Sequence, residues 1–219
     1  MSNKNKLLLW EIICILWIAI AGSFLHFLFE LTNYLKSIAV FAAVNESIWE
    51  HSKMYFWPGL LFALAQYSYT KNYHKNYWFG KAVALFTTPI TIVLFYQSYM
   101  LYAKYSETNP SLSIMLAIMF LGISSGQLAS YKILTSAVYP KNLSLLALPG
   151  IATLVIIFSV FTYYPPKIFL FENFACYKYT GEYGILEDYS PYQVFTKVDS
   201  SGDLKEGGGV NYCMEMNQN

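Results

Sequence analysis

The sequence predicts an all-α protein, a polytopic membrane helix bundle, and its composition and apolar patterning support this fold class. Only 12% of the 219 residues are charged, whereas a soluble domain carries about 25% charged residues. Hydrophobic residues make up 56% of the chain. They gather into long runs of about 20 residues, the length that a helix needs to cross the hydrocarbon of a bilayer. The net charge of +1 gives no indication of nucleic-acid binding.

Five such runs predict about five transmembrane helices. We expect them at residues 7–29, 47–69, 82–102, 112–134 and 143–163. Pro58, Pro89 and Pro149 lie inside the second, third and fifth runs, where a proline is expected to kink a helix. The fourth run contains Gly122 and Gly126, a GxxxG spacing that lets two helix backbones approach closely. We therefore expect a packing seam along this helix.

The segment between the first two spans is predicted to hold a short helix of its own. It covers residues 30–44 and is apolar from residue 33, but about 12 residues are too few to cross a membrane. A re-entrant or interfacial helix is the natural interpretation. Asn45 can cap the helix that follows, because its side-chain oxygen can accept an orphan backbone N–H. Ser47 with Glu50 also fits a capping box, in which case that helix begins two residues later.

The distribution of lysines predicts the orientation in the membrane. If the N-terminus is cytoplasmic, seven lysines lie on the cytoplasmic side and two in the short outer loops. The seven are Lys4, Lys6, Lys71, Lys75, Lys81, Lys132 and Lys141, and the two are Lys36 and Lys104. This asymmetry follows the positive-inside rule, and five spans then place the C-terminus outside the cytoplasm. We expect Glu11, near the cytoplasmic end of the first span, to extend toward the membrane surface.

Three regions are expected along the chain. They are a transmembrane helix bundle at residues 1–166, an extracytoplasmic aromatic cap at residues 167–199 and a flexible tail at residues 200–219. Aromatic side chains settle at headgroup level, and a tail rich in Ser, Gly, Asp and Asn is typical of flexible chain. Whether Cys176 and Cys213 form a disulfide stays open. The lipid bilayer is the expected partner, with a second membrane protein or another copy of this chain as a further one.

The candidate site lies in residues 45–53, the most polar stretch in the first half of the chain, together with His26. The first two spans are joined on the outer side, so these side chains are expected to converge near the outer membrane face. Imidazoles and carboxylates suit zinc or a similar divalent metal. The candidate metal ligands are His26, Glu46, Glu50 and His51, and the candidate catalytic residues are Glu46, Glu50 and His51.

Three functions are compatible with this stretch. A metal there would activate water, which predicts a metal-dependent membrane hydrolase acting on a lipid or lipid-linked substrate. The second function is a small transporter or channel subunit, with a substrate or ion path along Asn45, Ser47, Lys53 and Gln127. The third is a non-catalytic scaffold, in which the same residues cap helices and hydrogen-bond between them. The sequence has no H-E-x-x-H and no cysteine pair at ligand spacing, so whether the protein is an enzyme stays open.

Residues 44–53, Val-Asn-Glu-Ser-Ile-Trp-Glu-His-Ser-Lys, resemble the VNESxWEHxK core of an uncharacterised family of small bacterial membrane proteins, a domain of unknown function. Residues 161–163, 165–166, 170–171 and 181–185 look like the C-terminal signature of that family. The resemblance extends from Trp17 to Ile185, and the chain departs from it in an insert at 173–179 and in the tail beyond Leu186. The family has no established activity, so the resemblance implies a multi-pass membrane protein and marks the motif.

Overall fold

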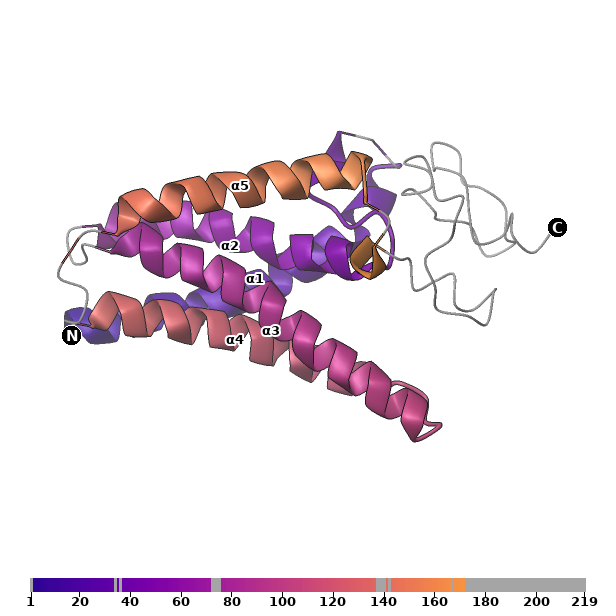
Figure 1. The fold of residues 1–219 in the computed structure, drawn as a ribbon. Helices are drawn as coiled ribbons and strands as arrows, with labels where there is room; N and C mark the ends of the chain where they lie inside the picture. Colours follow the sequence, from indigo (N-terminus) through magenta and orange to yellow (C-terminus); the bar gives the residue numbers. More distant parts are fainter. Residues whose placement is uncertain are drawn as a thin grey trace. The chain divides into compact units, whose positions relative to one another are not determined.

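A computed structural model describes residues 2–33, 35, 37–71, 76–136, 141, 143–166 and 168–171. The described residues form five α-helices and no strand, which confirms the all-α fold (Figure 1). The helices are α1 (Asn3–Leu31), α2 (Ile48–Thr70), α3 (Tyr77–Tyr105), α4 (Leu112–Thr135) and α5 (Ser144–Tyr163). Two one-turn 3-10 helices accompany them, η1 (Ile38–Val40) and η2 (Phe169–Phe171). Between α1 and α2, the described residues thus contain a single 3-10 turn where the sequence predicted a short re-entrant or interfacial helix.

The predicted spans correspond to the five α-helices, and α3 extends the furthest beyond its prediction. Pro58, Pro89 and Pro149 lie inside α2, α3 and α5 as expected. Almost all of the predicted aromatic cap and the whole predicted tail, with Cys176 and Cys213, lie outside the described residues.

Four of these helices are long and apolar enough to cross a membrane: α1, α3, α4 and α5. Helix α2 is not among them, although it has 23 residues. Its first turns contain Glu50 and Lys53, and Gln66 lies further along, so its sequence is less apolar than that of the other four. A count of five spans therefore stays a prediction, whereas the four apolar helices are consistent with insertion into a membrane.

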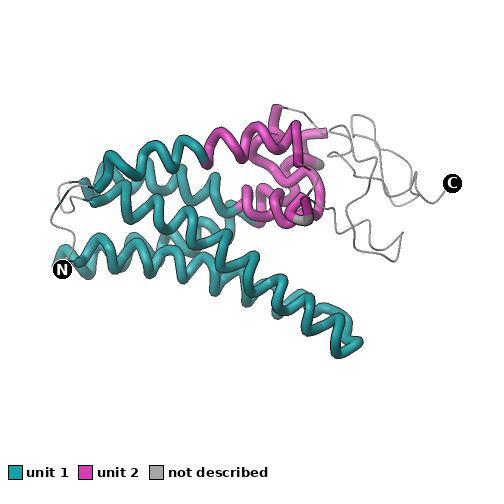
Figure 2. The backbone as a smooth tube through the Cα atoms, in the orientation of Figure 1, with its two compact units in different colours: residues 1–22, 55–153 teal, residues 23–54, 154–219 magenta. Residues whose placement is uncertain are grey.

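The chain divides into two compact units, coloured separately in Figure 2. Unit 1 consists of Met1–Gly22 and Tyr55–Thr153, and unit 2 consists of Ser23–Met54 and Leu154–Asn219. Helices α1, α2 and α5 therefore each contribute one part to each unit. The stretch at residues 45–53 belongs entirely to unit 2.

Two apolar clusters form the core of unit 1. The inner apolar cluster consists of Cys14, Ile18, Ala19, Tyr55 and Ile123. The N-terminal apolar cluster consists of Leu7, Tyr77 and Leu134. Each cluster contains residues of α1 and of α4, so these two helices lie side by side along unit 1. Cys14 is a buried free thiol in the inner cluster, as expected for a cysteine used as a small packing residue.

Helices α3 and α4 pack closely along the predicted glycine seam. A Cβ atom at Gly126 would meet the Thr88 side chain and would lie 2.9 Å from the carbonyl oxygen of Ala84. A Cβ atom at Gly122 would meet the side chain of Ile92. Only glycine leaves room for this approach, which confirms that the GxxxG spacing marks a helix-packing seam.

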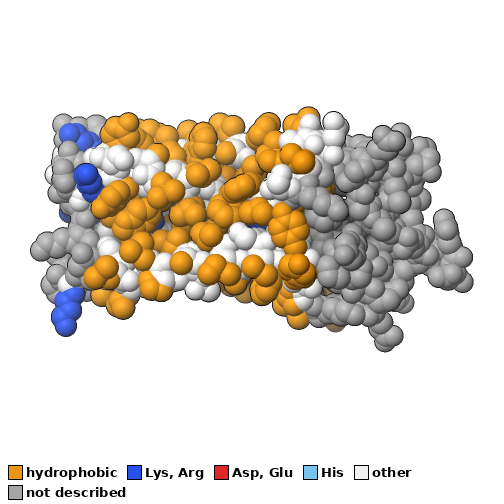
Figure 3. Space-filling model, turned by 90° about the horizontal axis from the view of Figure 1, so that it is seen from above, with side chains coloured by type: hydrophobic (Ala, Val, Ile, Leu, Met, Phe, Trp, Pro, Cys, Tyr) orange, Lys and Arg blue, Asp and Glu red, His pale blue; other side chains and the backbone are white. Residues whose placement is uncertain are grey.

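Many large apolar side chains face outward, while the charged residues Glu11, Glu50, Lys53 and Lys81 are buried. Ile20, Leu145 and Leu146 are 72–75% exposed, and in Figure 3 hydrophobic side chains cover most of the visible described surface, with lysines gathered near one end. Lys53 and Lys81, by contrast, are at most 2% exposed. A soluble monomer rarely presents so much contiguous apolar surface. The pattern indicates contact between the helices and a lipid bilayer.

The expectation that Glu11 reaches toward the membrane surface is wrong. Glu11 is buried in unit 1, where its carboxylate lies 2.7 and 2.8 Å from Nζ of Lys81 and accepts a 3.2 Å hydrogen bond from Gln66. Lys81 is likewise buried inside α3 and is not a loop residue. An opposite charge within reach holds the carboxylate inside the protein. Without Lys81, the predicted lysine asymmetry falls from seven against two to six against two.

Candidate functional site

The turn before α2 determines how the polar stretch enters the helix. The Ser47 hydroxyl accepts the backbone N–H of Glu50 at 3.2 Å, so Ser47 is the N-cap and α2 begins at Ile48. The Asn45 side-chain oxygen accepts the N–H of Ser47 at 2.9 Å, which closes the turn one step earlier. Of the two predicted helix starts, the later one is therefore confirmed. Glu50 does not complete the capping box, because its carboxylate accepts the N–H of Val44 at 3.0 Å instead.

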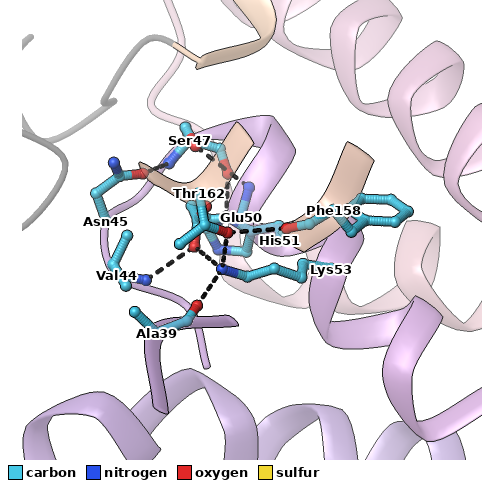
Figure 4. Close-up of polar contacts among 9 residues, drawn as sticks. All are labelled: Ala39, Val44, Asn45, Ser47, Glu50, His51, Lys53, Phe158 and Thr162. Carbon is cyan, nitrogen blue, oxygen red and sulfur yellow. Dashed lines mark hydrogen bonds and ion pairs between the residues drawn. The ribbon is translucent and has the colours of Figure 1, made fainter. Parts of the chain in front are cut away.

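A buried ion pair connects this turn with α5 inside unit 2 (Figure 4). Nζ of Lys53 lies 2.6 Å from the Glu50 carboxylate, 2.6 Å from the carbonyl oxygen of Ala39 and 2.8 Å from the hydroxyl of Thr162. These are three acceptors for the three N–H donors of an ammonium group. Thr162 in turn donates to the carbonyl of Phe158 at 2.9 Å. The Lys53 ammonium is therefore fully engaged within the protein.

Beside this ion pair, three side chains of unit 2 bring possible metal-binding atoms together. His26 of α1, Glu46 of the turn and His51 of α2 each offer one ligand atom, and these atoms lie within 4.8 Å of one another. One Glu46 oxygen lies 3.8 Å from Nε2 of His26, and the other lies 3.5 Å from Nε2 of His51. The two imidazole rings are 5.4 Å apart between centroids. We call His26, Glu46 and His51 the His–Glu–His triad.

A backbone carbonyl orients the His51 ring. Nδ1 of His51 lies 2.8 Å from the carbonyl oxygen of Ser47. Because a carbonyl can only accept, Nδ1 carries the hydrogen, and in the neutral ring Nε2 then presents a lone pair toward Glu46. Metal-binding histidines are commonly held in this way, by a hydrogen bond from the nitrogen that does not bind the metal.

The triad is open to its surroundings while the neighbouring ion pair is closed. The three triad side chains are 26–40% exposed, whereas those of Glu50 and Lys53 are at most 3% exposed. An ion or a small molecule can therefore reach the triad without displacing packed side chains. Of the four predicted metal ligands, the structure brings His26, Glu46 and His51 together, while the Glu50 carboxylate lies against Lys53.

The remaining predicted site residues lie elsewhere or serve the local structure. Asn45 and Ser47 hold the turn through their side-chain oxygens. Gln127 is buried in α4 and belongs to unit 1.

Sequence reasoning missed three features of this region. Thr162 and the carbonyl of Ala39 complete the environment of Lys53, and no local pattern indicates either contact. Trp49 lies in an aromatic cluster, with ring centroids 4.6 Å from Phe158, 5.6 Å from Phe161 and 4.7 Å from Phe171. The spacing of Phe158 and Phe161 on one face of α5 was the available signal for this cluster.

No curated protein and no solved structure matches the chain. The model of a family of unknown function, DUF6512, matches residues 1–185. The matched range includes every described residue of the triad and of the buried ion pair. Since the match covers most of the sequence, the chain belongs to the family of unknown function DUF6512.

Proposed function

We propose that this protein is a multi-pass membrane protein that binds a divalent transition metal, zinc or a similar ion, at His26, Glu46 and His51. The observation that carries this proposal is the clustering of three ligand atoms within 4.8 Å. We further propose that the bound metal serves the hydrolysis of a lipid or lipid-linked substrate.

The distances within the triad suit a tetrahedral metal site. Metal–ligand bonds of about 2.0–2.1 Å place two ligand atoms of a tetrahedron about 3.3 Å apart. The Glu46 oxygens lie 3.5 and 3.8 Å from the two histidine nitrogens. The three ligand atoms lie within 4.8 Å of one another, so rotations of these side chains would bring them closer together for all three to bind one ion.

The type of ligands favours a metal that takes part in chemistry over one that only supports the fold. Structural zinc sites fill all four positions with protein ligands, whereas catalytic sites use three and keep the fourth open. Two histidines and one glutamate are such a set of three. A zinc-like ion bound there would polarise a substrate oxygen and lower the pKa of a water molecule. The chain contributes the ligands, and the Ser47 carbonyl sets the orientation of His51.

Glu50 and Lys53 fit positioning roles in this proposal. The Glu50 carboxylate holds the N–H of Val44, two residues before Glu46, and so supports the turn that presents the Glu46 ligand. The Lys53 ammonium has an acceptor for each of its three donors, which favours the metal site over an ion path through Lys53.

The lysine distribution supports an orientation with the N-terminus in the cytoplasm. Because α1 begins at Asn3 and His26 lies near its end, the triad would then lie toward the extracytoplasmic side. A substrate in the outer leaflet could approach it from the bilayer, and this is why we propose a lipid or lipid-linked substrate.

Metal analysis of the purified protein tests the binding step. We expect roughly one zinc-like ion per chain, as for other mononuclear sites, and its loss in the His26→Ala and His51→Ala variants. The chain has three histidines, and the third, His74, provides a matched control: His74→Ala should retain the metal. If the wild type binds no more metal than His51→Ala, the proposal is wrong.

The hydrolytic step has a separate test. Phospholipids and lipid-linked phosphates, presented in mixed micelles, should be cleaved by the metal-loaded protein and not by the His51→Ala variant. A protein that binds metal but cleaves none of these substrates would retain the metal site and lose the hydrolase assignment.

A further inference from the structure

A second polar site lies inside unit 1, in a layer between its two apolar clusters. Glu11 of α1 forms an ion pair with Lys81 of α3, at 2.7 and 2.8 Å. The amide nitrogen of Gln66 of α2 donates to the same carboxylate at 3.2 Å. All three residues are at most 2% exposed. Three helices thus direct polar groups to one buried point.

Helix α4 adds two residues to this layer. Ile123 belongs to the inner apolar cluster and Leu134 to the N-terminal apolar cluster, and the buried residues Gln127 and Ser130 lie between them on the same face of α4. Glu11 occupies the same position on α1, between a residue of each cluster. Both clusters contain residues of α1 and of α4, so the segments between the clusters lie at the same level on the two helices. Gln127 and Ser130 of α4 therefore lie at the level of Glu11.

Three polar atoms of this layer have no hydrogen-bond partner among the residues that the structure describes. They are Oε1 of Gln66, Oε1 of Gln127 and Oγ of Ser130. The three side chains are at most 4% exposed. Buried polar atoms in native proteins are nearly always hydrogen-bonded, to the protein or to ordered water. Three unpaired atoms in one layer therefore indicate a bound molecule.

The chemistry of these atoms identifies the ligand. Two are amide oxygens that only accept hydrogen bonds, and the third is a hydroxyl that can accept or donate. The ligand must therefore donate hydrogen bonds or be a cation. Glu11 and Lys81 already neutralise each other, so a cation would leave an uncompensated positive charge among apolar side chains, which is unfavourable. A neutral donor avoids that cost.

We propose that the polar layer of Glu11, Gln66, Lys81, Gln127 and Ser130 is a buried hydration site that holds ordered water. Water donates to the unpaired oxygens of Gln66 and Gln127 and bonds to Ser130. It needs two to four polar partners in a buried site, and the layer supplies them. The water also solvates the Glu11–Lys81 ion pair within the apolar part of unit 1. The site shares no residue with the His–Glu–His triad and does not depend on the proposed metal.

The sign of a stability change tests the proposal. If water bridges the polar atoms, Ser130→Ala and Gln127→Leu each remove a partner of that water, and the Tm in detergent falls by about 2–4 °C or more. If the atoms face a dry interior, the same substitutions remove unsatisfied groups and the Tm stays equal or rises, which overturns the proposal. Ser98→Ala is the control: the Ser98 hydroxyl is exposed and donates to the carbonyl of Leu94 in its own helix, so the Tm should not change.

Two further measurements separate water from the alternatives. A Tm that rises with NaCl and not with choline chloride would identify a cation instead and overturn the proposal. An experimental density map at high resolution should show ordered water within hydrogen-bond distance of Gln127 and Ser130, and an empty layer in that map would overturn it as well.

Discussion

Two glutamates of the same stretch have opposite environments. Glu46 is 40% exposed and faces two histidines, while Glu50, four residues later, is 3% exposed and faces Lys53. Both carry the same carboxylate, so the difference comes from what surrounds them. An exposed carboxylate is available to a ligand, whereas a buried carboxylate needs a permanent counter-charge.

We therefore expect Glu46→Gln to lower metal affinity and Glu50→Gln to lower stability. Glu46→Gln replaces a charged ligand by an amide, and we expect it to lower zinc affinity by about 100-fold or more with little change in stability. Glu50→Gln leaves Lys53 buried without its counter-charge, and we expect the protein to lose about 3–5 kcal/mol of stability. Zinc titration and thermal unfolding in detergent measure the two effects. Equal effects of both variants on both readouts would contradict this division.

Removing Lys53 alone should lower the stability of the protein more than removing both Glu50 and Lys53. Lys53→Met leaves the Glu50 carboxylate buried and uncompensated, which costs about 3–5 kcal/mol. In the double variant Glu50→Gln/Lys53→Met no charge remains, so we expect part of that loss to be recovered. A double-mutant cycle on thermal unfolding gives the coupling energy. A double variant that loses the sum of the two single losses would show that the residues do not act as a pair.

Among the helices, α3 and α4 show how a short sequence pattern becomes a contact. Gly122 and Gly126 lie one turn apart on one face of α4 and leave room for Ile92 and Thr88 of α3. Because glycine has no side chain, the two backbones can come together, and the close approach gains dispersion contacts along the seam.

A methyl group at Gly126 should separate these helices. In Gly126→Ala, the new Cβ would lie 2.9 Å from the Ala84 carbonyl oxygen, which is backbone and cannot rotate away. We expect a loss of about 1–3 kcal/mol from overpacking, measured by thermal unfolding. Gly150→Ala in α5 is the matched control. Its Cβ would meet nothing closer than 3.6 Å, so the better helix propensity of alanine should leave stability equal or slightly higher. Equal losses in both variants would contradict a seam at Gly126.

Across the described residues, many large apolar side chains are exposed, while two ion pairs, Glu11 with Lys81 and Glu50 with Lys53, are buried. Outward-facing apolar side chains suit a bilayer, and pairing suits charges in an interior that has no water to solvate them. Within the part of the chain that the structure describes, four helices have the length and composition needed to cross. Helix α2 determines the topology, because the sides on which the later loops lie depend on whether α2 also crosses.

Accessible cysteines test whether α2 crosses the membrane. We expect Glu107→Cys, in the turn after α3, to react with an impermeant maleimide added to intact cells. Lys141→Cys, before α5, should react only after lysis, because five spans place it with the N-terminus in the cytoplasm. Both variants are made in a chain whose native cysteines are replaced. With the N-terminus in the cytoplasm, the reverse labelling would mean that only four helices cross.

Helix positions could be predicted from the sequence because they depend on local information. Long apolar runs place the helices, and Ser47 with Glu50 marks the start of α2. The candidate site could be predicted only in part. The interval of 20 residues between His26 and Glu46 says nothing about distance in space. Lys81, which pairs with Glu11, is 70 residues away in sequence, and Thr162, one of the three acceptors of Lys53, is 109 residues away. No local pattern encodes contacts of that range.

The amino-acid sequence alone determined that this is an all-helical protein with apolar helices, because hydrophobicity and capping act over one or two turns. It also marked residues 45–53 as the stretch where polar groups gather. Only the tertiary structure determined which charged side chains form pairs. It turned Glu50 and Lys53 toward each other, placed Glu46 between His26 and His51, and buried Glu11 with Lys81. The physical reason is that a charge removed from water must find its counter-charge in space, and that partner lies wherever the packing of the helices brings it.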